Sequence, residues 1–101
     1  MKYKIFQIKD LEKCPYSFMS WRFVHDKFSL SDYKQVYEGN IELDEKDTHQ
    51  DVKPIDYLEH LFYIFNINHP KDFKGHSLSV SDVVELDGKK YYCDSAGWQE
   101  L

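Results

Sequence analysis

Hydrophobic and polar residues alternate in the first segment of the chain, from Lys2 to Lys9. Tyr3 and Ile5 fall on one side of this segment, whereas Phe6 and Ile8 fall on the other. Alternation of β-branched and aromatic residues is typical of a β-strand. Because both sides carry large apolar residues, we expect a strand that is at least partly covered on both faces.

The next apolar residues are spaced as on a helix. Four large side chains of residues 17–28 lie at i, i+3, i+6 and i+10, which places them on one helical face. They are Phe18, Trp21, Val24 and Phe28. Ser17 or Ser20 is suited to cap the start. We therefore predict a short helix over residues 17–28.

Alternation returns in residues 33–43, which predicts a second strand. Tyr33 and Tyr37 fall on the same face of this strand if the alternation is unbroken. Gly39 and Asn40 interrupt the pattern before it resumes, and a glycine inside a strand often marks a bulge. We expect the strand to be broken or bulged at these two residues.

The strongest helical periodicity lies in residues 54–66. Pro54 suits the first turn of a helix, and the apolar residues then recur at i, i+3, i+7 and i+10. These residues are Ile55, Leu58, Phe62 and Phe65, with Leu61 beside them. Pro70 disfavours helix at the preceding residue, so we predict a helix that ends before His69.

A β-hairpin is predicted in residues 83–93, where two apolar-rich runs flank Asp87 and Gly88, a pair that favours a tight turn. A last strand is expected at residues 98–101. The predicted order is β-α-β-α-β-β-β in one domain of residues 1–101. We therefore expect an α+β fold, with a small, mostly antiparallel and partly barrel-like sheet packed with two helices.

Composition narrows the class of protein. The 101 residues are 42% hydrophobic and 17% aromatic, which is too apolar for a disordered chain. The net charge of -5 argues against a general nucleic-acid binder. The first residues lack the apolar core of a signal peptide, and no run approaches eighteen apolar residues. We expect a cytoplasmic protein that does not span a membrane, in which Cys14 and Cys93 are reduced thiols rather than one bridge.

Negative charge is concentrated in residues 38–56, which hold seven acidic and two basic side chains. An acidic band within this segment could meet a basic surface of a protein partner, including a groove that normally holds nucleic acid. The band consists of Glu42, Asp44, Glu45, Asp47 and Asp51. The alternative is that these residues form only a solvated loop.

A core of this size does not need all the aromatic side chains, so we expect a few of them to be exposed. The candidates are Trp21, Tyr57, Tyr63 and Trp98. Grouped on the surface, such residues would mark a protein interface. Stacking on single-stranded bases is the nucleic-acid alternative, but it needs basic neighbours, and the chain has one arginine, Arg22.

Residues 76–82 read H-S-L-S-V-S-D. His76, Ser79, Ser81 and Asp82 would serve a small hydrolase or a nucleic-acid-modifying enzyme if they converged on one cleft. A catalytic triad, however, usually draws its members from distant chain positions. Serine and aspartate close together in the sequence commonly form backbone turns. Turn formation is therefore the favoured interpretation of this segment.

Metal binding has little support in the spacing of the five histidines and two cysteines. A site built from His69, His76 and Cys93 is conceivable, but no H-x-x-x-H or C-x-x-C spacing is present. We predict no metal site and no cofactor. The two histidines are expected to hydrogen-bond backbone carbonyls, and Cys93 is expected to pack as a small apolar side chain.

Residues 65–98 read F-N-I-N-H-P-K-D-F-K-G-H-S-L-S-V-S-D-V-V-E-L-D-G-K-K-Y-Y-C-D-S-A-G-W. This run resembles the signature of the YodL-like domain family: a helix ending in F-N, then H/R-P-x-D-F-x-G-H/R-S-L/M-S-V-S-D-V-V, a D-G hairpin, and Y-Y-x-D-x-x-G-F/W. The earlier motifs Y-x-F-M-S-W and Y-x-x-V-Y-E-G are similar to longer members. The resemblance implies a domain of Firmicutes that is often encoded by conjugative and other mobile elements. It implies no particular reaction.

These observations favour a non-enzymatic protein-interaction module. We expect a mobile-element accessory protein that binds and modulates or inhibits a host or element-encoded protein. The sharpest version of this hypothesis is an anti-CRISPR or anti-restriction inhibitor, because inhibitors of host defence nucleases are usually small acidic proteins of such elements. The alternatives are the small enzyme that uses residues 76–82 and a single-stranded nucleic-acid binder.

Overall fold

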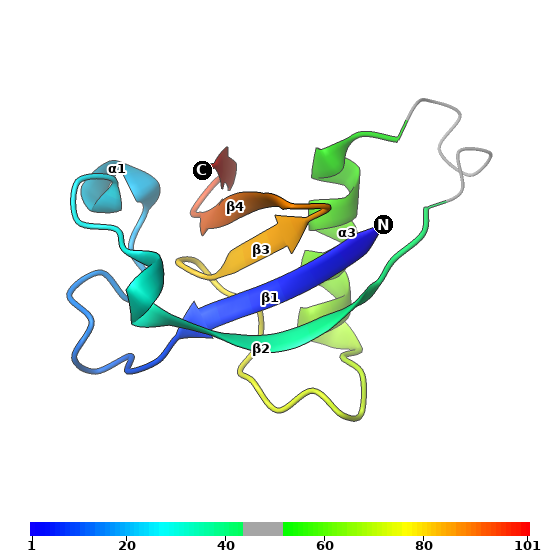
Figure 1. The fold of residues 1–101 in the computed structure, drawn as a ribbon, viewed down its shortest axis with the longest axis horizontal. Coiled ribbons are helices and arrows are strands. Elements are labelled where there is room, and N and C mark those ends of the chain that lie inside the picture. Colours follow the sequence, from blue (N-terminus) through cyan, green and yellow to red (C-terminus); the bar gives the residue numbers. More distant parts are fainter. Residues whose placement is uncertain (44–51) are drawn as a thin grey trace.

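The computed structural model describes residues 1–43 and 52–101. Within these ranges, five β-strands and two α-helices make up the fold (Figure 1). The strands are β1 (Lys2–Ile8), β2 (Tyr33–Asn40), β3 (Val83–Leu86), β4 (Lys89–Asp94) and β5 (Gly97–Glu100). The helices are α1 (Trp21–Val24) and α3 (Pro54–Ile67), and a 3₁₀ turn, η1 (Leu30–Asp32), precedes β2. The predicted order of strands and helices is confirmed.

The strands form one antiparallel sheet in the order β2-β1-β3-β4-β5. A barrel would require its first and last strands to pair with each other. Here β2 and β5 lie at opposite ends of the strand order, so the sheet is open. The expectation of a partly barrel-like sheet is therefore wrong.

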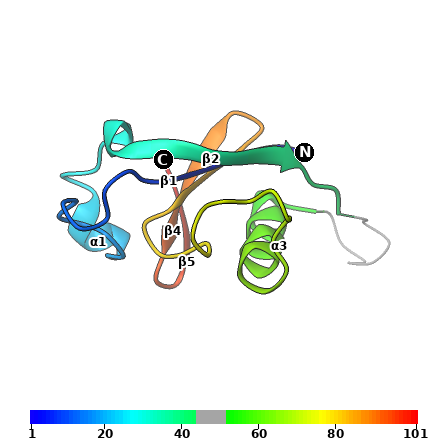
Figure 2. The same cartoon turned by 90° about the horizontal axis from the view of Figure 1, so that it is seen from below.

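Both faces of the sheet are covered, as the mixed pattern of β1 predicts. On one face, Tyr3 and Ile5 belong to a core cluster with the buried residues of α3. On the other face, Ile8 belongs to a second cluster with Val24 of α1. Figure 2 shows α3 and α1 on opposite sides of β4 and β5. The sheet is thus the middle layer between two small cores.

The first helix is much shorter than the predicted span of residues 17–28. Phe18 has a φ of 63°, which a right-handed helix does not allow, and α1 ends at Val24. Trp21, Val24 and Phe28 nevertheless pack in the same cluster. In this segment, the helical spacing correctly groups Trp21, Val24 and Phe28, but the helix itself covers only four residues and Phe18 is exposed.

The irregularity in β2 lies at Val36 and not at the predicted position. Ile5 and Phe6, which are adjacent in β1, pair with Tyr37 and Gln35. Val36 is therefore the extra residue of a β-bulge. A bulge shifts the alternation of side chains by one residue, so it reverses the faces of the residues beyond it.

The bulge separates two tyrosines that unbroken alternation would place on one face. Tyr33 packs in the cluster on the α1 side, whereas Tyr37 packs in the cluster on the α3 side. Gly39 has a different role from the predicted break. A Cβ atom at this position would lie 2.8 Å from the hydroxyl of Tyr3, so the glycine makes room for the tyrosine ring.

The β3–β4 hairpin has the predicted turn at Asp87 and Gly88. Their φ angles are 48° and 89°, as a two-residue type I′ turn requires. The next strand, β5, begins at Gly97, one residue before the predicted start. The local turn signal therefore identifies this part of the sheet correctly.

α3 begins at Pro54, as predicted, and its buried face includes only part of the predicted stripe. Its buried residues are Leu58, Leu61 and Phe65. Ile55 and Phe62, which the predicted stripe includes, are 42% and 37% exposed. The helix is apolar over more than the one stripe that a sheet can cover. No helix in the described ranges has the length and apolar character needed to cross a membrane.

Candidate functional site

The acidic band predicted to bind a partner is represented in the structure by one residue. Glu42 is exposed, and its carboxylate pairs with the amine of Met1 at 2.7 Å. Asp44, Glu45, Asp47 and Asp51 lie outside the described residues.

Three of the aromatic residues predicted to be exposed are half-buried instead. Trp21, Tyr57 and Trp98 pack against the margins of the two core clusters. The ring centroid of Trp21, for example, lies 5.0 Å from that of Tyr92. Tyr63 is 58% exposed, as expected. The tertiary structure places an aromatic ring beside each tryptophan, and the sequence alone does not reveal these neighbours.

Exposed apolar side chains are concentrated on α3. Four residues of this helix are between 37% and 68% exposed, and we call them the α3 ridge. They are Ile55, Phe62, Tyr63 and Ile67. Ile55 and Phe62 are about two turns apart and share a face, as do Tyr63 and Ile67, about one turn apart. The sequence signal for the ridge is the surplus of apolar residues beyond one helical stripe.

A groove of about 190 Å³ adjoins the α3 ridge, between α3 and the β4–β5 hairpin. Beside it, the rings of Phe62 and Trp98 meet edge to face, with centroids 6.5 Å apart. Glu59 and Asp94 line this groove, and Glu100 lies on β5. None of these three carboxylates pairs with a cation among the described residues. The result is an apolar surface bordered by negative charge and by the edge strand β5.

The serines of the H-S-L-S-V-S-D segment are bonded to the backbone. The Ser79 hydroxyl donates to the carbonyl of Ser77 at 2.7 Å. Ser81 is fully buried, and its Oγ accepts the backbone N–H of Phe18 at 2.9 Å. Within the described residues, neither hydroxyl is hydrogen-bonded to His76. This geometry is that of the predicted turns, without a Ser-His-Asp relay.

Asp82 is a buried carboxylate, only 1% exposed. Its Oδ2 accepts hydrogen bonds from Nε2 of Gln7 at 3.1 Å and from the N–H of Ser79 at 2.9 Å. Burial raises the pKa of Asp82 to about 7, although the two hydrogen bonds oppose this shift. The carboxyl group is therefore poised to hold a proton near neutral pH.

His76 faces Asp82, with its Nε2 3.8 Å from Oδ1 of the carboxyl group. Both atoms are enclosed, and neither has a hydrogen-bond partner among the described residues. The Nδ1 of His76 lies 2.7 Å from the carbonyl of Ser77 and must donate to it. The separation of Nε2 from Oδ1 is too long for a direct hydrogen bond, and we call these two residues the His76–Asp82 pair.

Both ring nitrogens of His76 face groups of the protein itself. One ring nitrogen of His76 is bonded to the backbone, and the other is directed at Asp82. Gln7 ties the pair to β1, because its Nε2 also donates to the carbonyl of His76 at 2.8 Å. The pair therefore joins β1 to the loop before β3.

The residues considered for metal binding are not brought together. Within residues 1–43 and 52–101, no group of three His, Cys, Asp or Glu side chains could hold a metal ion. Cys14 and Cys93 are both free thiols. Burial raises the pKa of Cys93 to about 12, with the nearby carboxylates adding to the shift. The Cys93 thiol is therefore protonated and is not a nucleophile at neutral pH.

Comparison with known proteins identifies the family of the chain. The family model of the YodL-like domain matches residues 2–101, so the match covers every strand and helix described above. No curated protein and no solved structure matches the chain. The His76–Asp82 pair, the serine turns and the β3–β4 hairpin all lie within residues 65–98, the run that resembles the family signature. The chain belongs to the YodL-like domain family.

Proposed function

We propose that this YodL-like domain is a non-enzymatic protein-interaction module that binds its partner through the α3 ridge and the adjoining groove. The observation that carries the proposal is the exposure of four apolar side chains on one helix, beside an edge strand of the sheet. Apolar groups gathered on a surface commonly mark protein interfaces. Aromatic residues such as Phe62 and Tyr63 are enriched at the energetic centres of interfaces.

Charge indicates the kind of partner. Glu59 and Asp94 line the groove beside the α3 ridge, and Glu100 lies on the edge strand β5. Six of the seven acidic residues of segment 38–56 precede α3 in the sequence. A partner with a basic surface complements this arrangement, and opposite charge also speeds the encounter. In its finer form, the proposal is an anti-CRISPR or anti-restriction inhibitor that occupies the basic groove of a nucleic-acid-processing enzyme of host defence. The mobile-element setting that the resemblance implies supports this form.

A matched pair of variants tests the proposal. Tyr63→Ala/Ile67→Ala removes exposed apolar groups from α3, and Phe23→Ala removes a 49% exposed ring from α1. The full chain is immobilised, and bound host proteins are identified by mass spectrometry. We expect a specific partner that binds wild type and Phe23→Ala, and whose affinity falls at least about tenfold with the double variant.

A second variant tests separately whether the partner binds through a basic surface. Glu59→Lys/Glu100→Lys reverses two charges that have no partner among the described residues, and it should weaken the same complex. The proposal is wrong if no specific partner is found, or if the α3 double variant binds as well as wild type. Equal loss with Phe23→Ala would also count against it, because binding would then not depend on the α3 ridge.

A further inference from the structure

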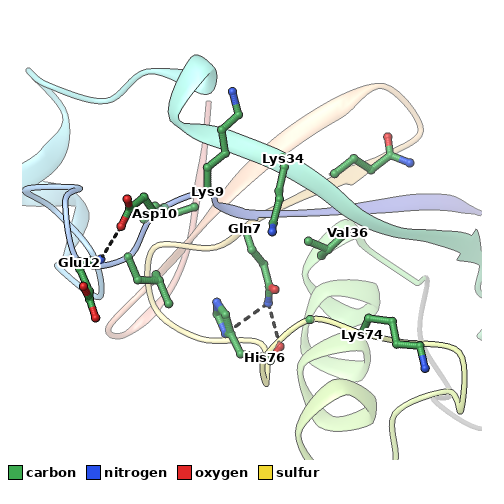
Figure 3. Close-up of a pocket in the computed structure, with 12 residues that line it drawn as sticks. Gln7, Lys9, Asp10, Glu12, Lys34, Val36, Lys74 and His76 are labelled. Carbon is green, nitrogen blue, oxygen red and sulfur yellow. Dashed lines mark hydrogen bonds between the residues drawn. The ribbon is translucent and has the colours of Figure 1, made fainter.

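A cavity of about 600 Å³ opens where the end of β1 meets β2 and the loop before β3 (Figure 3). Its lining includes Gln7, Lys34, Val36, Lys74, Gly75 and His76. It shares no lining residue with the groove beside the α3 ridge. Sites for small molecules commonly measure about 300–1,000 Å³. The cavity is therefore large enough for a ligand and separate from the proposed protein interface.

The side chains that line the cavity carry a net positive charge, although the protein as a whole is acidic. Three lysines and two acidic residues line it: Lys9, Lys34, Lys74, Asp10 and Glu12. None of the three lysines forms a salt bridge with a described residue. The Asp10 carboxylate already accepts the N–H groups of Glu12 and Lys13. In a chain with a net charge of -5, this local excess of cations favours an anionic ligand.

The lysines differ in where they point. Figure 3 shows Lys34 reaching from β2 toward Gln7, whereas Lys9 and Lys74 are directed away from it. The ammonium group of Lys9 donates to the carbonyl of Ser31 at 2.9 Å. Lys34 is thus the cation placed to contact a ligand, and the other two add positive charge at the rim.

Gln7 supplies a hydrogen-bonding group to the same cavity. Its side chain is held in place, because Nε2 donates to the carbonyl of His76 and to the carboxylate of Asp82. Oε1 receives no hydrogen bond from a described residue, and a Cβ atom on Gly75 would lie only 2.4 Å from it. The glycine therefore lets the amide rest against the loop, with an oxygen acceptor left for a ligand.

We propose that this cavity binds a small molecule that carries a carboxylate or phosphate group together with a hydroxyl donor. The oxyanion pairs with the ammonium group of Lys34, and the hydroxyl donates to Oε1 of Gln7. Carboxylates and phosphates both present a negatively charged oxygen to the lysine. Sites for small molecules commonly combine one charged side chain with a few fixed neutral hydrogen-bonding groups.

Titration of the ¹⁵N-labelled chain, followed by NMR, tests the site with defined probes. Two probes combine an anion with a hydroxyl: malate carries carboxylates and a hydroxyl, and glycerol 3-phosphate carries a phosphate and hydroxyls. Acetate and sulfate are controls that carry only the anion. Glycerol is a control that carries only hydroxyls. We expect saturable shifts of the Gln7 side-chain amide and the Gly75 N–H with malate or with glycerol 3-phosphate. The probe that causes these shifts shows whether the site binds a carboxylate or a phosphate. Acetate and sulfate should bind at least about tenfold more weakly, and glycerol should cause no shift.

A matched lysine control identifies the contact. Lys34→Gln should weaken binding of the responding probe about tenfold, whereas Lys89→Gln removes the same charge from the β3–β4 hairpin, outside the cavity, and should leave the affinity unchanged. The proposal is overturned if neither malate nor glycerol 3-phosphate gives a saturable shift, or if glycerol binds equally well. Equal weakening by both lysine variants would also overturn it, since binding would then follow net charge and not the site.

Discussion

The backbone N–H of Phe18 donates a hydrogen bond to Oγ of Ser81 at 2.9 Å, and both residues hold a positive φ, 63° and 83°. Such a conformation costs a non-glycine residue about 1–3 kcal/mol. The bond joins the loop before α1 to the turn before β3. The Tyr33 hydroxyl adds a second link, because it donates to the carbonyl of Ser81 at 2.5 Å. The two strained turns therefore hold each other in place.

Replacement of Ser81 separates the hydrogen bond from the strain. Ser81→Ala should lower the free energy of unfolding by about 1–3 kcal/mol, because the N–H of Phe18 loses its acceptor. Ser81→Gly loses the same hydroxyl but adopts a positive φ easily, so it should be about 1 kcal/mol more stable than Ser81→Ala. Urea unfolding followed by tryptophan fluorescence measures both. A Ser81→Gly protein less stable than Ser81→Ala would show that the backbone is not strained here.

Gly75→Ala should disturb the packing of Gln7. The added Cβ would lie 2.4 Å from Oε1 of Gln7 and 2.9 Å from the Phe73 ring, so we expect a loss of about 1–3 kcal/mol in the free energy of unfolding. In a Gln7→Ala background, the closest clash is absent, and the same substitution should cost at least about 0.5 kcal/mol less. Strict additivity in this double-mutant cycle would contradict the contact.

Stability should depend on pH through Asp82. The folded-state pKa is about 7, above the ordinary 3.8, so the folded protein binds this proton more tightly than the unfolded chain. Burial of Asp82 therefore lowers stability as the pH rises from about 4 to about 7, by an amount on the order of 4 kcal/mol. Asp82→Asn keeps the shape without the titration, so it should flatten the dependence between pH 5 and pH 8.

The matched control for this pH dependence is Asp87→Asn on the exposed hairpin turn. Asparagine suits that turn, and the substitution should retain the wild-type dependence. Chemical unfolding at several pH values measures all three proteins. A wild-type slope that persists in Asp82→Asn would show that the buried carboxyl group is not its source.

The two thiols should differ in reactivity. Cys93 is buried with its pKa raised to about 12, whereas Cys14 is half-buried. In the native protein at pH 8, iodoacetamide should therefore label Cys14 and spare Cys93, because the thiolate is the nucleophile. Both should react in denaturant. Mass spectrometry of the labelled peptides measures the two rates, and equal native rates would contradict the burial of Cys93.

The sequence predicts those elements whose determinants are local. The Asp87–Gly88 turn and the start of α3 at Pro54 depend on the backbone preferences of the residues themselves, and both predictions are confirmed. The bulge at Val36 depends instead on how β2 pairs with β1. The late start of α1 follows the turn at Phe18, whose N–H donates to Ser81, 63 residues away.

The candidate sites were only partly predictable for the same reason. An apolar surplus on α3 is visible in the sequence, but the exposed residues follow from which stripe meets the sheet. Gln7 and Asp82 are hydrogen-bonded across 75 residues of sequence, and no spacing rule connects them. Trp21 and Trp98 look like surplus aromatics until the sheet order supplies their neighbours.

Photo-crosslinking at Tyr63 tests the proposed interface most directly. A benzophenone amino acid replaces Tyr63, which is 58% exposed on the α3 ridge, or Phe23, which is 49% exposed on α1. Each full-length protein is irradiated in host lysate, and its adducts are identified by mass spectrometry. The account predicts one abundant adduct with a protein that has a basic surface, formed from position 63 and not from position 23. No specific adduct from position 63, or the same adduct from both positions, would contradict it.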